Sequence, residues 1–101
     1  MIETETIIVG GGPAGSSCAW KLKQANKRCI ILDKAEFPRP KLCAGWITPK
    51  VVEMLNIQDY SGLLKLKNIK VSVRGFKKTS KTNQYSIRRF EFDNFLLKRT
   101  G

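Results

Sequence analysis

A glycine-rich stretch near the start of the chain has the residue types and spacing of a phosphate-binding turn. Residues 10–15 read Gly-Gly-Gly-Pro-Ala-Gly and match the pattern G-x-G-x-x-G. Gly10 permits a tight turn, Gly12 lets the backbone approach a diphosphate, and Gly15 lets the following helix pack closely on the strands. The partial positive charge of that helix's N-terminus favours a bound anion. The stretch therefore predicts a dinucleotide site.

An acidic residue lies at the position from which dinucleotide-binding units contact the ribose of the cofactor. Asp33 follows the apolar run 29–32, at the expected distance beyond the glycines. Its carboxylate can accept both hydroxyl hydrogens of an adenosine ribose, and it would repel the 2′-phosphate of NADP. The alternative is an ordinary glycine turn in an α/β domain, with Asp33 merely ending a strand. The coincidence of strand, turn, helix and acidic residue favours the cofactor interpretation.

The composition excludes several kinds of catalytic and metal site. The 101 residues contain no histidine, which removes the commonest general base and metal ligand. The three cysteines, Cys18, Cys29 and Cys43, are too few and too widely spaced for a zinc site or a disulfide framework, so we predict no metal. Their odd number favours a reducing compartment. The first apolar run is too short for a signal peptide, so we expect a cytoplasmic protein.

The apolar pattern predicts the elements that position these residues. Thr4–Val9 and Arg28–Leu32 carry apolar runs typical of strands buried on both faces. A helix from about Pro13 to Ala25 lies between them, and together the three form a right-handed βαβ unit. The helix residues that share one face, and that we expect to face the core, are Ala14, Cys18, Leu22 and Ala25.

The remainder of the chain is predicted to add a short helix, a hairpin and a last helix. Pro49–Leu55 is the short helix, which starts after an N-capping threonine. The alternating segments Ile69–Phe76 and Gln84–Arg89, separated by the polar loop Lys77–Asn83, predict an antiparallel hairpin. The last helix covers about Glu91–Arg99 and has phenylalanine and leucine on one face. The fold class is therefore α/β.

Two stretches resemble the beginning of FAD-dependent oxidoreductases of the geranylgeranyl reductase type. They are residues 7–17, Ile-Ile-Val-Gly-Gly-Gly-Pro-Ala-Gly-Ser-Ser, and residues 33–39, Asp-Lys-Ala-Glu-Phe-Pro-Arg. These enzymes belong to a wider flavoprotein group that includes aromatic hydroxylases and flavin-dependent halogenases. The pair Pro13-Ala14 is more typical of FAD enzymes than of NAD dehydrogenases. The resemblance implies an incomplete Rossmann-like FAD-binding unit, in which Lys34 beside Asp33 also contacts the cofactor.

A third stretch resembles the family segment Pro-Arg-x-Lys-x-Cys-Gly-Gly. It covers residues 38–45, with Ala44 in place of the commoner glycine. In relatives, the arginine and the backbone near the cysteine lie along the flavin side of the cofactor, so the resemblance implies Arg39, Cys43 and Gly45 as cofactor contacts. It also makes Cys43 a candidate proton donor or active-site wall residue. The alternative for Cys43 is a buried structural thiol.

A fourth stretch, residues 88–96, resembles the family helix start Arg-x-x-Phe-Asp-x-x-Leu. In relatives the arginine faces the cofactor groove and the aspartate helps to fix the helix start, which implies Arg89 as a cofactor contact. The alternative is a surface arginine paired with Glu91 or Asp93. The residues that match the family pattern are Arg89, Phe92, Asp93 and Leu96.

The resemblance implies a function that the chain holds only in part. Family members reduce carbon–carbon double bonds of isoprenoid or lipid-like substrates by hydride transfer from reduced FAD, with NAD(P)H or a redox partner as electron donor. A flavin-dependent monooxygenase or halogenase shares this beginning and stays open. Residues 1–101 would be the N-terminal portion of the FAD-binding domain: a βαβ unit (1–33), a flavin-side loop with a short helix (34–60), and a hairpin with a helix (61–101). We expect a truncated reading frame or fragment that is inactive alone and binds FAD weakly or not at all.

The net charge of +11 is concentrated in the second half of the chain, where residues 60–101 contain eleven basic and two acidic side chains. A nucleic-acid interpretation takes the basic residues as a phosphate-binding face with Phe76 and Tyr85 nearby. The alternative is a solvated hairpin whose lysines discourage edge pairing, and we favour it because no nucleic-acid module is recognised. Attraction to an anionic membrane surface is a third interpretation. The basic residues concerned are Lys65, Lys67, Lys70, Arg74, Lys77, Lys78 and Lys81.

Overall fold

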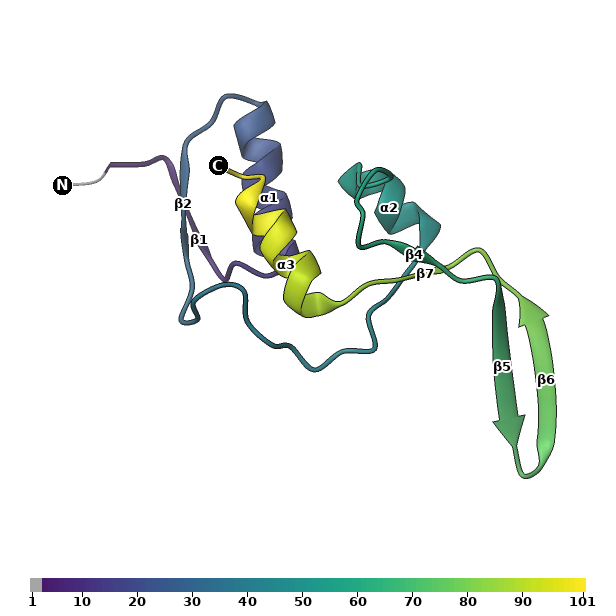
Figure 1. Ribbon diagram of the computed structural model, residues 1–101. Coiled ribbons are helices and arrows are strands. Elements are labelled where there is room, and N and C mark those ends of the chain that lie inside the picture. The colour runs from purple at the N-terminus through teal and green to yellow at the C-terminus, as the bar shows by residue number, and fades with distance from the viewer. Residues whose placement is uncertain (1–2) are drawn as a thin grey trace. The chain divides into compact units, whose positions relative to one another are not determined.

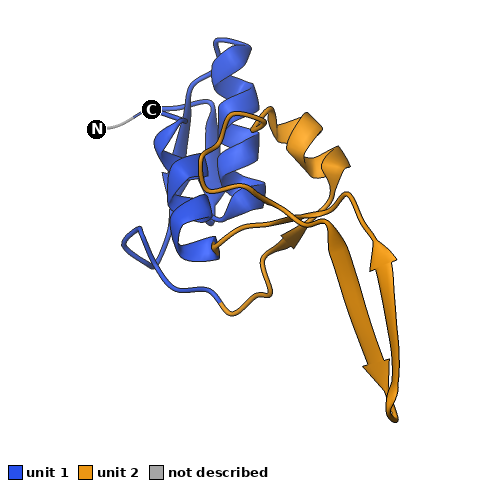
Figure 2. Ribbon diagram, turned by 45° about the vertical axis from the view of Figure 1, so that its right-hand side comes forward, with its two compact units in different colours: residues 1–41, 89–101 blue, residues 42–88 orange. Residues whose placement is uncertain are grey.

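A computed structural model describes residues 3–101 and divides the chain into two compact units (Figure 2). Residues 1–41 and 89–101 form the first unit, and residues 42–88 form the second. Met1 and Ile2, at the start of the predicted 1–33 segment, lie outside the described residues. The predicted segments 34–60 and 61–101 are each shared between the two units.

The first unit contains the predicted βαβ arrangement. It consists of β1 (Thr6–Val9), α1 (Pro13–Gln24) and β2 (Cys29–Leu32), and the two strands pair in parallel. The last helix, α3 (Arg89–Lys98), lies beside α1 (Figure 1). The α/β fold with a Rossmann-like parallel unit, predicted from the apolar pattern and the glycines, is confirmed.

The two strands are not buried on both faces, so that prediction was wrong. Ile7 is 62% exposed and Val9 is 85% exposed, whereas the side chain of Ile8 points towards α1. Both helices of the unit lie on the same side of β1 and β2 (Figure 1). Among the described residues of this unit, no element covers the other side, and alternate strand residues are exposed there.

The buried face of α1 also differs from the predicted one. Ser16 and Ala19 are buried, whereas Cys18 is exposed. The close approach of Gly15 to Gly10 and Ile8 determines which face of α1 lies against β1. The buried Ser16 hydroxyl donates to the Gly12 carbonyl at 2.8 Å, so its polar group is satisfied. The predicted face residues Ala14 and Ala25 are exposed as well.

The predicted apolar face of α3 is confirmed at two of its positions. Phe92 and Leu96 are 2% and 0% exposed, and together with Ala19 they form the apolar core of the first unit. Just after the helix, the guanidinium of Arg99 lies over the ring of Trp20, 3.7 Å from its centroid. This cation–π contact fastens the end of α3 to α1.

The second unit contains the predicted short helix and a small antiparallel sheet. α2 (Pro49–Leu55) begins as expected, because the Thr48 hydroxyl accepts a hydrogen bond from the Val51 N–H at 3.4 Å. The sheet has the strand order β3 (Trp46–Ile47), β7 (Tyr85–Ser86) and β4 (Leu64–Lys65). The buried apolar residues of this unit are Val52, Ile57 and Ile87.

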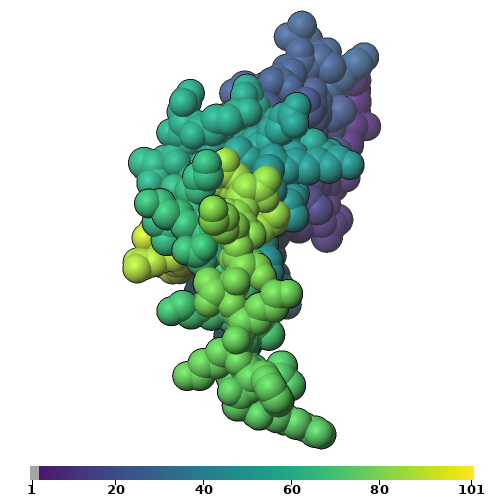
Figure 3. Space-filling model, turned by 90° about the vertical axis from the view of Figure 1, so that its right-hand side faces the viewer, coloured from purple at the N-terminus to yellow at the C-terminus, as the bar shows by residue number. Residues whose placement is uncertain are grey.

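The hairpin exists, but its predicted strands were partly wrong. It consists of β5 (Asn68–Val73) and β6 (Phe76–Lys81), so the predicted loop 77–83 is mostly strand. Arg74 and Gly75 have φ values of 49° and 85°, which produces a tight two-residue turn. In the predicted partner segment 84–89, the only strand is β7, and it pairs with β3 and β4 instead. Figure 3 shows the hairpin, in green, extending from the rest of its unit.

Within residues 3–101, no helix has both the length and the apolar character needed to cross a bilayer.

Candidate dinucleotide-binding site

The glycine turn joins the carboxyl end of β1 to the start of α1. Gly10 has a φ of +104°, which favours glycine, and its N–H donates to the Leu32 carbonyl at 2.7 Å. A Cβ on Gly15 would overlap the carbonyl oxygen of Gly10 and would lie 3.1 Å from Cγ2 of Ile8. The helix therefore passes so close to the strand that only glycine fits at position 15.

The N-terminus of α1 presents backbone donors to the turn. Gly12 is the N-cap, and no side chain caps the helix. The first turn contains Pro13 and no acidic residue. First-turn N–H groups that have no capping side chain are suited to an anion, and the helix dipole adds to the attraction. This donor set fits the diphosphate of a dinucleotide.

Asp33 is tied directly to the glycine turn. Its Oδ2 accepts the Gly11 N–H at 2.7 Å, and its Oδ1 accepts the Ala35 N–H at 2.8 Å. The Gly11 hydrogen bond, followed by that of Ala35 and by the charges of Arg39 and Lys34, holds the pKa of Asp33 below its usual value. The carboxylate is therefore ionised at neutral pH. A carboxylate has about four lone-pair sites, so both oxygens can still accept a ribose hydroxyl.

Acid is expected to destabilise the first unit through Asp33. Because its pKa is lowered in the folded state, this carboxylate stabilises the native protein above its unfolded pKa of 3.8, and that stabilisation is lost as the pH falls through the folded pKa. We expect the free energy of unfolding to decrease below about pH 4, and part of that decrease to be missing in Asp33→Asn. Urea unfolding as a function of pH measures this free energy for the wild-type protein and for Asp33→Asn. Identical pH profiles would contradict this assignment.

Asp33 and the glycine turn line the same cavity of the first unit, which has a volume of about 520 Å³. The cavity lies at the carboxyl ends of the parallel strands, where open α/β sheets bind their ligands. Sequence reasoning missed Ala35, Pro40 and Lys41, which also line it. The predicted cofactor-binding residues that it brings together are Gly10, Gly12, Asp33, Lys34, Arg39 and Arg89.

The two arginines of this cavity are held by one buried acid, Asp93. Nη1 of Arg39 lies 2.8 Å from Oδ2 of Asp93. Arg89 forms a two-point contact, with Nε 2.8 Å from Oδ1 and Nη2 3.0 Å from Oδ2. Asp93 is 0% exposed, and its two partners are 15% and 19% exposed. The predicted alternative for Arg89, pairing with Asp93, is therefore present, and Arg89 also lines the cavity.

The central position of Asp93 was not predicted. The resemblance assigned it only to the helix start, although two sequence signals were available. Asp93 follows Arg89 by four residues, a spacing that brings opposite charges together on one helix face. It also lies between Phe92 and Leu96, the positions that face the core.

The charges of the two guanidinium groups and the carboxylate sum to a net positive charge, which complements a diphosphate.

Cys43 and Gly45 belong to the second unit. Cys43 is exposed, and its Sγ accepts the Gly45 N–H at 3.3 Å, so the buried-thiol alternative is wrong. Gly45 has a φ of +73°, and a Cβ there would overlap the carbonyl oxygen of Ile87. The carbonyl of Gly45 also accepts the Ile87 N–H at 2.8 Å. Both contacts give Gly45 a structural role in its own unit. The predicted cofactor contacts of both residues stay predictions.

Gly12→Ala is expected to separate binding from folding. The added Cβ would lie 3.4 Å from Nη2 of Arg39, the end of a flexible side chain, so the unfolding temperature should change little. The methyl group would occupy the space in which phosphates approach the helix start, and we expect ADP affinity to fall roughly tenfold. Thermal unfolding and titration calorimetry measure the two effects. An unchanged ADP affinity would contradict this role for Gly12.

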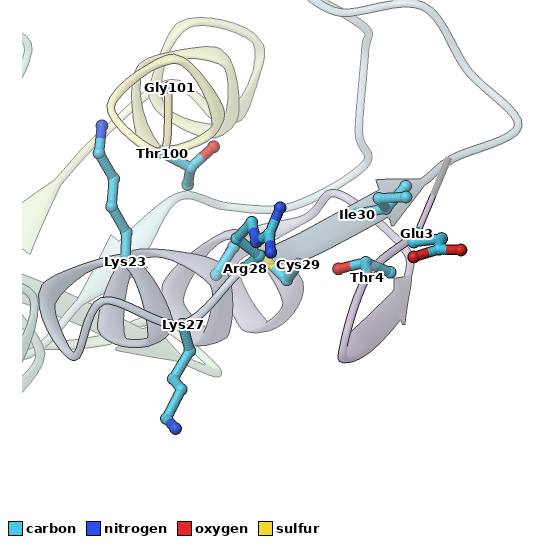
Figure 4. Close-up of a pocket in the computed structure, with 10 residues that line it drawn as sticks. Glu3, Thr4, Lys23, Lys27, Arg28, Cys29, Ile30, Thr100 and Gly101 are labelled. Atoms are coloured by element: carbon cyan, nitrogen blue, oxygen red, sulfur yellow. The ribbon is translucent and has the colours of Figure 1, made fainter. Parts of the chain in front are cut away.

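A second cavity of the first unit, of about 440 Å³, lies at the opposite, amino ends of the strands. Lys23 extends towards Thr100 and Gly101, whereas Lys27 extends the other way (Figure 4). The cavity mixes these lysines with Glu3 and contains no part of the glycine turn. Its charge pattern and its position at the amino ends both argue against a dinucleotide there.

The chain matches known proteins in sequence. The family described as an NAD(P)-binding Rossmann-like domain matches residues 8–53. An uncharacterized protein of Methanosarcina barkeri is 33% identical over 98% of this chain and 27% of its own length. Digeranylgeranylglycerophospholipid reductase 1 of Methanopyrus kandleri is 32% identical over 97% of the chain and 27% of its length. Geranylgeranyl diphosphate reductase of Rhodobacter capsulatus is 39% identical over 55% of the chain and 14% of its own length.

The fold is also shared with solved structures. The myxobacterial chondrochloren halogenase CndH, an FAD-dependent halogenase, superimposes with a TM-score of 0.80 at 21% identity, over 96% of this chain and 26% of the halogenase. The chain thus spans about a quarter of the length of these proteins, which it matches over nearly all of its own length. It has the Rossmann-like fold of FAD- and NAD(P)-binding domains, is homologous in sequence to geranylgeranyl reductases, and shares its fold with a flavin-dependent halogenase.

Proposed function

We propose that the first unit binds the adenosine diphosphate half of FAD. The observation that supports this most strongly is the cavity shared by the glycine turn, the start of α1 and Asp33. In this proposal Asp33 accepts the ribose hydroxyls, and the backbone donors at Gly12 and in the first turn of α1 hold the diphosphate. Arg39 and Arg89 add charge and planar hydrogen-bond donors beside it. Pro13, Ala14 and Gly15 shape the turn, and Lys34 contributes a further positive charge.

FAD is favoured over NAD by the pair Pro13-Ala14 and by the relatives. The solved structure with a TM-score of 0.80 is an FAD-dependent halogenase. When bound, FAD would supply hydride transfer to or from a substrate carbon. The residues of this chain would then bind and orient the cofactor, with Cys43 and Gly45 proposed to contribute on its flavin side.

We further propose that the longer protein to which such a portion belongs reduces carbon–carbon double bonds of an isoprenoid lipid, with NAD(P)H or a redox partner as electron donor. Two relatives that are at least 32% identical are named as reductases of geranylgeranyl diphosphate and of digeranylgeranylglycerophospholipid. The halogenases share the fold at lower identity, for example 21%, so their chemistry is the less favoured alternative.

Flavin fluorescence anisotropy tests cofactor binding by this chain. We expect weak FAD binding, with a dissociation constant of roughly 0.1–1 mM, because most of the proposed contacts are with the adenosine diphosphate half. ADP should displace FAD, and FMN, which lacks the adenosine half, should not bind. FMN binding as tight as FAD binding, or failure of ADP to compete, would overturn the proposal.

A chimera tests the reductase proposal. The matching segment of the Methanopyrus kandleri reductase would be replaced by this chain, and both flavin content and hydrogenation of geranylgeranyl chains would be measured. A folded chimera that retains FAD and reduces the chains supports the proposal. A folded chimera without flavin contradicts it.

A further inference from the structure

Asp93 reaches the cavity only through the two arginines. It is fully buried in α3 and is not one of the residues that line the cavity. Both of its carboxylate oxygens are engaged by guanidinium groups, at 2.8 Å, 2.8 Å and 3.0 Å. Asp93 therefore has no surface with which to meet a ligand. Any influence it has on binding acts through Arg39 and Arg89.

Two neighbouring guanidinium groups repel each other, and long side chains lose rotamer freedom when a ligand fixes them. A carboxylate shared by both groups offsets their repulsion and fixes their side chains before the ligand binds. Arg39 uses Nη1 for Asp93, and its Nη2 lies 3.4 Å from the position of a Cβ on Gly12, at the start of α1. One donor group of Arg39 thus lies against the anion-binding end of the helix.

We propose that Asp93 is a positioning residue that fixes Arg39 and Arg89 for the diphosphate of the cofactor. This inference rests on the proposed binding of adenosine diphosphate by the first unit. Asp93 leaves the adenosine end of the site to Asp33, which follows β2 and whose carboxylate accepts hydrogen bonds from the Gly11 and Ala35 N–H groups. Its effect is therefore confined to ligands that carry phosphate.

The sign of the effect separates positioning from simple electrostatics. Asp93→Asn removes a buried negative charge from between two cations. If Asp93 affected binding only through its charge, the variant would bind a phosphate ligand more tightly, because an opposing charge is gone. If Asp93 positions the arginines, the variant binds phosphate ligands less tightly, although the site has become more positive.

The test compares ADP with adenosine by ligand-observed NMR titration of the full chain. For Asp93→Asn we expect ADP affinity to fall roughly tenfold, while adenosine affinity stays unchanged. Glu36→Gln, which removes an exposed acid of the first unit that does not line the cavity, is the matched control and should change neither affinity. ADP binding by Asp93→Asn that equals or exceeds wild-type binding would overturn the inference. A parallel loss of adenosine binding would also overturn it, because the role would then be structural.

A second variant covers the case in which Asp93→Asn does not fold, since breaking a buried ion pair is strongly destabilising. Asp93→Glu keeps the charge and displaces the carboxylate by one methylene group. We expect it to weaken ADP binding selectively, and wild-type ADP binding by Asp93→Glu would overturn the inference. Wild-type protein that binds neither ADP nor adenosine would instead overturn the proposed function on which the inference rests.

Discussion

Gly15→Ala is expected to prevent the first unit from forming its native turn. The new Cβ would overlap the carbonyl oxygen of Gly10, a backbone atom that cannot move without displacing β1. Overpacking in a core typically costs about 1–3 kcal/mol, and we expect the upper end or more because the clash is with backbone. That loss is a large share of a small domain's total stability, roughly 5–15 kcal/mol. Thermal unfolding followed by circular dichroism measures it.

Gly11→Ala is the matched control for this substitution. A Cβ on Gly11 would lie 3.4–3.5 Å from Asp33, Leu97 and Phe37, which are ordinary van der Waals distances. We therefore expect its unfolding temperature to remain close to that of the wild-type protein. Equal unfolding temperatures for Gly15→Ala and Gly11→Ala would contradict the close helix–strand approach.

Asp33→Asn is expected to cause the largest loss of nucleotide affinity among folded variants. The substitution removes the charge of the group proposed to accept the ribose hydroxyls. Hydrogen bonds to charged groups contribute about 1.5–3 kcal/mol, which corresponds to a loss of roughly 10- to 100-fold in ADP affinity. Titration calorimetry measures this loss. Glu36→Gln removes a nearby exposed charge that does not line the cavity and should leave ADP affinity unchanged.

The same variant tests ligand selectivity. The carboxylate of Asp33 should repel a phosphate on the ribose 2′ oxygen, so wild-type protein should bind ADP more tightly than its 2′-phosphorylated analogue. Asp33→Asn should narrow this difference. A preference for ADP that is unchanged in the variant would show that another group excludes the 2′-phosphate.

The glycine turn and Asp33 could be predicted because their requirements are local. Backbone conformation at Gly10 and close packing at Gly15 exclude other residue types, and Asp33 is placed by the end of a short strand. The spacing between them follows from the length of one helix and two connections. A single sequence therefore contains most of what defines this part of the site.

The hairpin register could not be predicted from alternation alone. β6 has the sequence Phe-Lys-Lys-Thr-Ser-Lys and is exposed along its whole length, so no buried face imposes a period of two. The register follows instead from the two-residue turn at Arg74-Gly75. Arginine is not a usual residue at a positive φ, and the turn signal was correspondingly weak.

The buried face of α1 and the role of Asp93 depend on tertiary contacts. Ser16 is buried because Gly15 brings its helix against the strands, although serine is usually exposed. Asp93 is buried because Arg39, more than fifty residues earlier in the chain, reaches it from the cavity side. Propensity and periodicity describe neighbours along the chain and contain neither of these contacts.

The most direct test of the central claim is a titration of ¹⁵N-labelled protein with ADP, followed by amide chemical shifts. We expect the shifts to concentrate at Gly10–Gly15 and at Asp33, with little change at Lys23 and Arg28 beside the second cavity. Shifts confined to the second cavity, or no shifts at millimolar ADP, would contradict the proposed binding of adenosine diphosphate at the glycine turn.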